Sequence, residues 1–346
     1  MEITFILSGE HETLPRAEIN ACLEVEKTSF TERYNNKGIL VLEIPDEESN
    51  IVDILGKRIA YTHEICKLLF ETDNDNLRKI VEKYPWHDVI RNDYAVRVKR
   101  IGTDPDFNSQ EMEIEIGGII KRIIGDRAKV NLETPETFLR TIVLDDKILV
   151  CQRLIKRAKK HYYNLKPHKR PFFYPGSMSP KLARGMNNLA RVKTGSIVLD
   201  PFCGTGGILI EAGIIGAKVV GIDIDEKMVE GTKKNLEYCN IKDYDVFQGD
   251  ARDIELPYKV DAIVTDPPYG ISASTAGIES KKIYKESLSS MQEIVKKNGF
   301  ICMATPHYLD IHELASHTKF KIIEQYHIRM HKSLTRVISV LKRIEK

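Results

Sequence analysis

The second half of the chain alternates short apolar runs with helical stretches, and this rhythm restricts the folds that it can adopt. Strands that are apolar along their whole length are buried on both faces, which is typical of a parallel sheet covered by helices. The last two strand-like segments, 320–328 and 336–341, are joined by too few residues for a crossover helix, so we expect an antiparallel hairpin at the sheet edge. The other apolar runs are 196–200, 218–223, 245–250, 260–266 and 299–304.

The first half mixes strand-like and helical patterns, which predicts an α+β region. Residues 94–100 alternate apolar and polar side chains, with the period of a half-buried strand. Residues 112–124 have apolar side chains at helical spacing, and a helix over 14–26 would begin with Thr13 as its cap and Pro15 in its first turn. The remaining expected elements are strands at 3–7, 38–44, 129–132, 137–144 and 147–151, and a helix at 47–56.

The charge distribution is uneven, although the net charge of the whole chain is only +2. Residues 151–193 contain twelve Lys or Arg residues and no Asp or Glu, so the rest of the chain carries an excess of acids. Aromatic residues are interleaved with these cations. Because cations neutralise phosphates and aromatic rings stack on bases, this segment is expected to contact nucleic acid. The expected RNA-binding residues are Arg153, Lys156, Lys159, Lys160, Lys169 and Arg170.

A glycine-rich turn follows the apolar run that ends at Asp200. The segment Asp200–Gly207 lies between that run and a helical stretch, which is where open α/β sheets bind ligands. A dinucleotide-binding turn would have GxGxxG spacing and would face a pyrophosphate, beside which a carboxylate is unfavourable. A carboxylate beside a cationic sulfonium or ammonium group is favourable. Asp200 therefore points away from NAD and towards S-adenosylmethionine.

Two further acids end strand-like segments in the same half. Asp223 ends the run at 218–223, where an acid can accept hydrogen bonds from ribose hydroxyls. Asp250 ends the next run, where its carboxylate could accept a hydrogen bond from an adenine amino group. A single acid in such a place could simply cap a helix. Three acids at successive strand ends favour a site for a cofactor that contains adenosine.

The segment Asp266-Pro267-Pro268-Tyr269 ends the fourth apolar run, at the same edge of the expected sheet. The two prolines fix the backbone and remove two donors, which leaves carbonyl groups exposed. The Asp266 carboxylate and the Pro267 carbonyl could then accept both protons of one planar amino group, while Tyr269 stacks on the base. Accepting those protons stabilises the ammonium that develops during methylation. We therefore expect Asp266, Pro267 and Tyr269 to be catalytic.

Together, Asp200–Gly207 and Asp266–Tyr269 resemble the methyltransferases that act on exocyclic base nitrogens. The segments Arg170–Arg184 and His331–Arg336 look like the archaeal tRNA guanosine-10 N2-methyltransferases, and the N-terminal half is similar to their THUMP module. The resemblance implies S-adenosylmethionine as cofactor, tRNA as partner and a target base flipped out of its stack. It implies that the cofactor contacts Asp200, Phe202, Gly204, Gly206, Asp223, Ile224, Asp250, Ala251, Asp266 and Pro175.

The resemblance also implies the architecture and the activity. The expected fold is α/β, with a C-terminal Rossmann-like methyltransferase sheet that ends in an antiparallel hairpin, and an N-terminal α+β region that contains the THUMP domain. The expected activity is S-adenosylmethionine-dependent methylation of the guanosine N2 amine in tRNA, at position 10, once or twice. The expected domains are an N-terminal α+β subdomain at 1–48, a THUMP domain at 49–152, a basic linker at 153–175 and a methyltransferase domain at 176–346.

Several alternatives stay open at this point. The same chemistry could act on another tRNA guanosine, on guanine N2 of ribosomal RNA or on adenine N6 of DNA, and a protein that binds RNA without catalysis is a further possibility. No apolar window is long enough for a transmembrane helix, and the N-terminus lacks the pattern of a secretory signal. The six cysteines are dispersed and form no CxxC pair, which argues against disulfides and zinc. We therefore expect a cytoplasmic protein without a metal ion. We take a monomer as the expected state, although no sequence pattern determines it.

Overall fold

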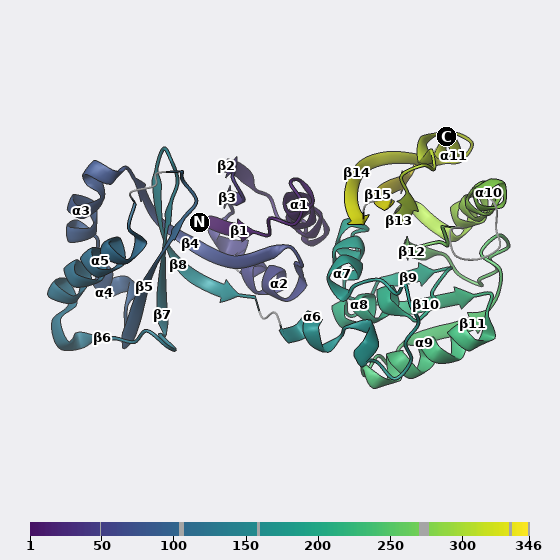
Figure 1. Cartoon of the computed structure of the whole chain (residues 1–346), viewed down its shortest axis with the longest axis horizontal. Coiled ribbons are helices and arrows are strands. Elements are labelled where there is room, and N and C mark those ends of the chain that lie inside the picture. The colour runs from purple at the N-terminus through teal and green to yellow at the C-terminus, as the bar shows by residue number, and fades with distance from the viewer. Residues whose placement is uncertain (49, 104–106, 158–159, 270–276, 332–333, 345–346) are drawn as a thin grey trace. The chain divides into compact units, whose positions relative to one another are not determined.

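The computed structural model describes the chain except for residues 49, 104–106, 158–159, 270–276, 332–333 and 345–346. The described residues form two compact units, whose elements are labelled in Figure 1. The second unit includes two segments from the N-terminal half of the chain, which the expected domain boundaries do not assign to it. The first unit contains Met1–Gly9, Thr28–Gly56 and Thr62–Arg157, and the second contains Glu10–Lys27, Lys57–Tyr61 and Ala158–Lys346.

The first unit is built on an eight-stranded sheet with the strand order β2-β3-β1-β4-β8-β7-β5-β6. Strand β5 runs parallel to β6 and β7, and the other neighbouring strands are antiparallel. The strands are β1 (Glu2–Leu7), β2 (Thr31–Asn36), β3 (Ile39–Glu43), β4 (Thr62–Thr72), β5 (Asp93–Arg100), β6 (Lys129–Val130), β7 (Thr137–Val143) and β8 (Ile148–Lys156). The helices that begin in this unit are α2 (Ile51–Arg58), α3 (Asn74–Lys83), α4 (Trp86–Val89) and α5 (Ser109–Ile124).

Helix α5 illustrates how local sequence sets these elements. The Asn108 side chain caps its start by accepting hydrogen bonds from the backbone N–H groups of Gln110 and Glu111, at 3.0 and 3.3 Å. Gly125 follows its last turn with a φ of +63°, a backbone conformation that favours glycine. Its apolar stripe is buried in one core with Trp86 and Tyr94, so burial of this stripe stabilises the helix.

The second unit contains a seven-stranded sheet with the order β11-β10-β9-β12-β13-β15-β14. Strands β9 to β13 are parallel, whereas β15 pairs antiparallel with β13 and β14, so the expected terminal hairpin at the sheet edge is confirmed. The strands are β9 (Ile197–Asp200), β10 (Lys218–Asp223), β11 (Tyr244–Gln248), β12 (Val260–Thr265), β13 (Val295–Pro306), β14 (Phe320–His331) and β15 (Leu334–Arg343). The helices are α1 (Leu14–Glu26), α6 (Lys160–Asn164), α7 (Pro180–Leu189), α8 (Gly207–Ile215), α9 (Glu226–Tyr238), α10 (Gly277–Ile294) and α11 (Ile311–Ser316).

Helices cover both faces of this sheet, as the apolar runs predict. Val198 and Val219 lie in one core with residues of α7, α8 and α9. Their chain neighbours Leu199 and Val220 lie in a second core with residues of α10 and α11. Because successive side chains of a strand point to opposite faces, this alternation requires an apolar residue at nearly every position of the central strands.

Some expectations about local structure are wrong. The Thr13 side chain does not cap α1; His11 Nδ1 instead accepts hydrogen bonds from the backbone N–H groups of Thr13 and Leu14, both at 3.2 Å. The helix expected at 47–56 begins only at Ile51, after a 3₁₀ turn at Asp46–Glu48. The strand expected at 147–151 continues to Lys156, because β8 pairs along its whole length with the long strand β4.

Helix α7 is among the elements that the sequence pattern does not reveal. Gly185 and two consecutive asparagines lower its intrinsic helix propensity. The Ser179 Oγ accepts a hydrogen bond from the backbone N–H of Leu182, at 3.3 Å, which caps the helix. A Cβ atom at Gly185 would lie 2.7 Å from Tyr61 Cε2, so the glycine allows α7 to pack closely against this aromatic ring. Tertiary packing therefore stabilises a helix that its sequence alone does not predict. The other elements that the sequence pattern does not reveal are β2, β4, α3, α4, α6 and α11.

Candidate active site

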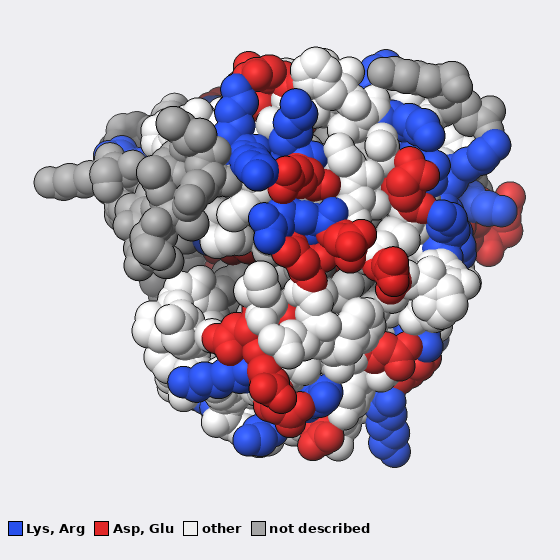
Figure 2. Space-filling view, turned by 90° about the vertical axis from the view of Figure 1, so that its right-hand side faces the viewer, with Lys and Arg blue, Asp and Glu red and all other residues white. Residues whose placement is uncertain are grey.

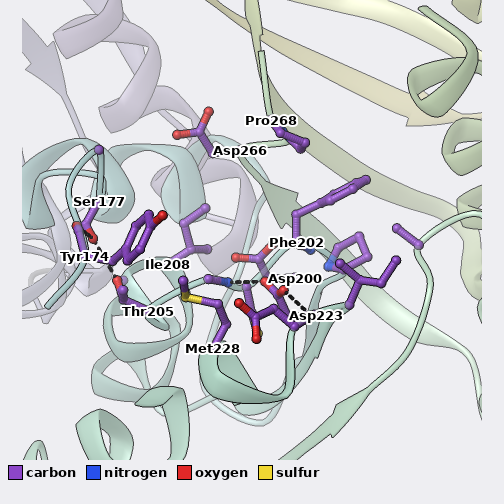
Figure 3. A pocket seen from close by; sticks show the side chains of 18 of the residues that line it. Tyr174, Ser177, Asp200, Phe202, Thr205, Ile208, Asp223, Met228, Asp266 and Pro268 are labelled. Carbon is purple, nitrogen blue, oxygen red and sulfur yellow. Dashed lines mark hydrogen bonds between the residues drawn. The ribbon is translucent and has the colours of Figure 1, made fainter. Parts of the chain in front are cut away.

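A cavity of about 840 Å³ opens at the carboxyl ends of the central strands of the second unit (Figure 3). Asp223, Asp200 and Asp266 follow or end the adjacent strands β10, β9 and β12, and all three line the cavity. The segment Tyr174–Met178, which precedes α7, contributes another part of the wall. The chain therefore brings the glycine-rich turn and the Asp266 motif to one cavity, as the sequence predicts for neighbouring parallel strands.

The glycine-rich turn has the backbone that its sequence implies. Gly204 and Gly206 have φ values of +53° and +76°, in the left-handed region that favours glycine. A Cβ atom at Gly206 would also lie 2.9 Å from Thr232 Cγ2 of helix α9. The backbone N–H of Gly204 donates to Asp223 Oδ2 at 2.8 Å. The turn is thus fixed against the end of β10, and its backbone forms part of the cavity wall.

Asp200 is buried, with 1% of its surface exposed. Its carboxylate accepts hydrogen bonds from Thr265 Oγ1 at 2.7 Å and from the Phe202 backbone N–H at 3.1 Å. Burial raises the pKa of Asp200 to about 7, and the nearby carboxylates of Asp266 and Asp223 also raise it. A site that concentrates three carboxylates in this way favours a cationic ligand.

Asp250 lies at the cavity rim and forms hydrogen bonds with a residue close to it in sequence. Its carboxylate accepts hydrogen bonds from the Arg252 guanidinium, at 2.9 Å from Nε, and these bonds lower the pKa of Asp250. Ile224, after β10, is 67% exposed although it is apolar, and Ala251 is buried. The exposed Ile224 side chain therefore provides an apolar surface on which an aromatic ring can lie.

Side chains from β15, from α10 and from the turn after β13 hold the Asp266 motif, together with Tyr269 of the motif itself. The Tyr269 hydroxyl donates to Asp266 Oδ1 at 2.5 Å, and an Arg336 guanidinium nitrogen lies 3.1 Å from Asp266 Oδ2. The Tyr284 hydroxyl donates to the Pro267 carbonyl at 3.3 Å, and the Tyr308 hydroxyl donates to the Tyr269 carbonyl at 2.6 Å. Burial raises the pKa of Asp266, and the Arg336 charge opposes that rise. Sequence reasoning missed the roles of Tyr284, Tyr308 and Arg336, since no local pattern connects them to the motif.

The structure places the expected cofactor-binding and catalytic residues as follows. Gly206 lies in the glycine-rich turn but does not line the cavity. Pro267 and Tyr269 lie in the Asp266 motif and do not line it either. The expected residues that line the cavity are Pro175, Asp200, Phe202, Gly204, Asp223, Ile224, Asp250, Ala251 and Asp266.

The expected RNA-binding residues have different surroundings. Lys156 and Lys160 are exposed. The Arg153 guanidinium lies 3.4 Å from the Phe138 ring centre and 3.7 Å from Glu64. The Lys169 ammonium lies 3.3 Å from the ring centre of Tyr163, which is itself exposed. Lys159 lies outside the described residues.

Arg170 requires a correction. It is only 5% exposed, and its Nε donates to the Leu165 carbonyl at 3.0 Å. Its NH1 lies 3.2 Å from the position that a Cβ of Gly207 would occupy, at the start of α8. The guanidinium is therefore packed inside the unit and does not face a phosphate, so Arg170 anchors the linker instead of binding RNA.

The segment after Arg170 is fixed to α9, which sequence reasoning also missed. The Asn235 side chain accepts a hydrogen bond from the Phe172 backbone N–H at 3.0 Å and donates to the Phe172 and Thr205 carbonyls, both at 2.9 Å. Ser177 Oγ lies 3.0 Å from Thr205 Oγ1 (Figure 3). Asn235 thus joins the basic linker to the glycine-rich turn.

Charges of both signs mix on the face shown in Figure 2, where Lys and Arg are interspersed with Asp and Glu.

Among the described residues, no group of three or more His, Cys, Asp or Glu side chains has the arrangement of a metal site. None of the described helices combines the length and apolar character needed to cross a membrane.

Comparisons with known proteins agree with this geometry. Family models match residues 71–152 to the THUMP domain and residues 167–338 to the RMKL-like methyltransferase domain. The chain is 48% identical over 344 residues to the tRNA (guanine(10)-N2)-dimethyltransferase of Methanothermobacter thermautotrophicus, and the match covers 99% of this chain and 100% of that protein. It is 39% identical over 370 residues to the protein of the same name from Methanocaldococcus jannaschii, with 99% and 100% covered. The solved structure of TrmN from Thermus thermophilus shares the fold, with a TM-score of 0.58 at 19% identity over 99% of this chain and 100% of that one.

Proposed function

We propose how this chain, which belongs to the family of tRNA (guanine(10)-N2)-dimethyltransferases, divides its reaction among the residues of the cavity. The enzyme uses S-adenosylmethionine to methylate the N2 amine of guanosine 10 in tRNA. One observation carries the assignment of roles: Asp266, from the amine-binding motif, lines the same cavity as Asp200 and Gly204 of the glycine-rich turn.

The cavity residues fit S-adenosylmethionine in size and charge. Gly204, in a left-handed conformation, lines the cavity without a side chain, and Asp200 adds negative charge when ionised. Asp223 and Asp250 offer carboxylate acceptors for the ribose and the adenine amine, and exposed Ile224 offers an apolar surface for the base. When bound, the cofactor supplies a methyl group on a positively charged sulfur.

Asp266 and Pro267 provide the acceptors for the target amine. The N2 lone pair of guanine is delocalised into the ring, so the nitrogen becomes a better nucleophile as it pyramidalises. The Asp266 carboxylate and the Pro267 carbonyl accept hydrogen bonds from the two N2–H groups and stabilise the positive charge that develops on N2, and the Asp266 carboxylate takes the proton that N2 then loses. Tyr269 offers an aromatic ring for the flipped guanine. After one transfer a single proton remains on N2, and Asp266 alone can accept it, which fits a second methylation.

The first unit and the basic linker provide contacts for tRNA. Along the sequence we assign an N-terminal subdomain at 1–48, a THUMP domain at 49–152, a linker at 153–175 and a methyltransferase domain at 176–346, except that residues 10–27 and 57–61 pack with the methyltransferase unit and are assigned to it. Lys156 and Lys160 are exposed cations in the first part of this linker. We also propose that the protein is a monomer, which light scattering of the free protein tests. We propose a cytoplasmic location as well, which fits the tRNA substrate.

The test of this function is the identity of the methylated nucleotide. Purified protein is incubated with methyl-labelled S-adenosylmethionine and an unmodified tRNA transcript, and the product is mapped by nuclease digestion and mass spectrometry. The expected result is one or two methyl groups on guanosine 10. A matched transcript with adenosine at position 10 should stay unlabelled. Label on another nucleotide, or on an atom other than N2, would contradict the proposal.

Replacing Lys156 and Lys160 with glutamine should weaken tRNA binding and make it less dependent on salt. Each cation that contacts one phosphate contributes about 0.9 to the slope of log K against log salt for duplex nucleic acid. The double variant should therefore lose up to about 1.8 from that slope. Filter binding at several salt concentrations measures it. Lys234→Gln, an exposed cation on α9, is the control. An unchanged slope in the double variant would remove both lysines from the interface.

Asp200 should make the binding of S-adenosylmethionine depend on pH near neutrality. Because burial raises its pKa to about 7, Asp200 is mostly neutral at pH 6 and mostly ionised at pH 8. Only the ionised form attracts a cationic ligand, so affinity should rise with pH, by up to about tenfold per pH unit below the pKa, and level off above it. Calorimetric titration between pH 5.5 and 8.5 measures this. Asp200→Asn should bind with a smaller pH dependence, and an identical profile would assign the titration to another group.

A further inference from the structure

The terminal hairpin sends one buried cation to the Asp266 motif. Arg336 lies near the start of β15, opposite Pro306 of β13, and only 7% of its surface is exposed. Its Nε donates to the Tyr269 hydroxyl at 2.6 Å, and its NH2 lies 3.1 Å from Asp266 Oδ2. One guanidinium therefore contacts both functional side chains of the motif, from a strand about 70 residues further along the chain.

The Tyr269 hydroxyl occupies one of the acceptors that the target amine needs. Asp266 Oδ1 already accepts the Tyr269 hydroxyl proton, at 2.5 Å. A guanine amine that reaches Oδ1 must share it with this hydroxyl or displace it. When the hydroxyl is displaced, its oxygen still accepts the Arg336 Nε–H, so Tyr269 keeps a partner. Arg336 also keeps Oδ2 in place while Oδ1 changes partners.

We propose that Arg336 is a positioning residue. It orients the Asp266 carboxylate and holds the Tyr269 hydroxyl, so that Oδ1 can exchange the hydrogen bond from that hydroxyl for one from the target amine. This inference rests on the proposed function of Asp266 and adds a residue outside its motif. The backbone of the motif has separate supports, since Tyr308 and Tyr284 bind the carbonyls of Tyr269 and Pro267. Arg336 therefore acts on the side chains and not on the path of the backbone.

The positive charge of Arg336 favours the ionised form of the Asp266 carboxyl. Burial raises the pKa of the Asp266 carboxyl, and the Asp266 carboxylate in turn raises the pKa of the buried Asp200. Tyr269 and Tyr284 are the further titratable groups that face Asp266, and burial raises the pKa of both. Among the groups that face Asp266 within the described residues, Arg336 is the one that contributes positive charge.

The test compares Arg336→Gln, Arg336→Lys and the wild type in single-turnover methylation of tRNA across pH. For Arg336→Gln, loss of the cation should move the acidic limb of the rate profile upward by about 1 to 3 pH units, since an opposite charge at this distance shifts a carboxyl pKa by that amount. The rate at pH 7 should fall about tenfold or more and recover towards pH 9. The KM for S-adenosylmethionine should change less than about twofold, because Arg336 does not line the cavity.

The other variants separate positioning from folding. Arg336→Lys keeps a charge but lacks the fork that reaches both partners, so it should keep the wild-type pH limb and lose rate. Tyr269→Phe removes the shared hydroxyl, and its effect should not add to that of Arg336→Gln. Arg329→Gln, an exposed cation on β14 of the same hairpin, should leave both rate and profile unchanged.

Three outcomes would overturn the proposal. These are an unaltered rate in Arg336→Gln, an equal loss at every pH in both variants together with a lower Tm, or full additivity with Tyr269→Phe. If Arg336→Gln does not fold, the rate and the profile of Arg336→Lys decide. The proposed function itself fails only if the wild type, assayed alongside, does not methylate guanosine N2.

Discussion

Asp266→Ala should lower the rate of methyl transfer by about a hundredfold to a thousandfold, the loss that follows removal of a main electrostatic stabiliser of a transition state. The carboxylate is the one charged acceptor that the motif offers to the target amine, and the Pro267 carbonyl beside it is neutral and already accepts a hydrogen bond from Tyr284. The affinity for tRNA should stay within about threefold, because one pocket side chain contributes little to an interface that depends mainly on phosphate contacts. Single-turnover assays and filter binding measure the two quantities.

The matched control for Asp266→Ala is Asp253→Ala, which removes an exposed carboxylate of the same unit outside the cavity lining. It should leave the rate unchanged. Asp266→Asn adds a stricter comparison, since the amide keeps one acceptor oxygen but loses the charge. A weakened tRNA affinity with a normal rate in Asp266→Ala would show that this carboxylate binds RNA and is not catalytic.

Deleting residues 1–150 should prevent the methyltransferase unit from folding, even though its sheet lies wholly in the remaining chain. The deletion removes α1 and residues 57–61, which pack inside that unit. Glu18 is fully buried and accepts hydrogen bonds from the backbone N–H groups of Ala60 and Tyr61, at 2.6 and 2.8 Å, and from Asn188 Nδ2 at 2.8 Å. Asn188 would remain with a buried, unsatisfied amide, and Leu14 and Tyr61 would leave the apolar core.

These losses are comparable to the stability of a whole domain. An unsatisfied buried donor costs about 1–3 kcal/mol, and each large apolar side chain contributes about 1.5–3 kcal/mol by its burial. Since domains are stable by about 5–15 kcal/mol, the truncated chain should show no cooperative thermal transition by near-ultraviolet circular dichroism. In the full chain, Glu18→Ala should lower the Tm by several degrees, whereas Glu12→Ala, an exposed acid just before α1, should not. A truncated chain that unfolds cooperatively near the wild-type Tm would contradict this.

The sequence predicts the parts of the site that lie directly after strands. Asp200, Asp223 and Asp266 could be assigned because an apolar run places each of them at one edge of a parallel sheet. Arg336 and Tyr284 reach the same motif from β15 and α10, and only the pairing of distant strands and the packing of a helix bring them there. Arg170 shows the opposite error, since a cation in a basic run is expected at the surface and the fold buries it.

Local sequence patterns also miss elements of the fold that depend on contacts between distant residues. Helix α7 carries glycine and asparagine at positions where a helix on its own would favour other residues, and its packing against Tyr61 overrides that preference. Strand β4 has an interrupted alternation, and register shifts in its pairing with β8 and β1 account for it. Both elements depend on residues distant in sequence, which local patterns do not report.

The interleaved order of the two units has a consequence for synthesis on the ribosome. Helix α1 leaves the exit tunnel early, yet α7, against which it packs, follows roughly 150 residues later. At about 5–20 residues per second, Leu14, which belongs to the methyltransferase core, waits roughly 8–30 seconds for α7 to be synthesised. The nascent chain thus exposes the apolar face of α1 before its partner helix has been made, and a chaperone can shield this face until α7 emerges.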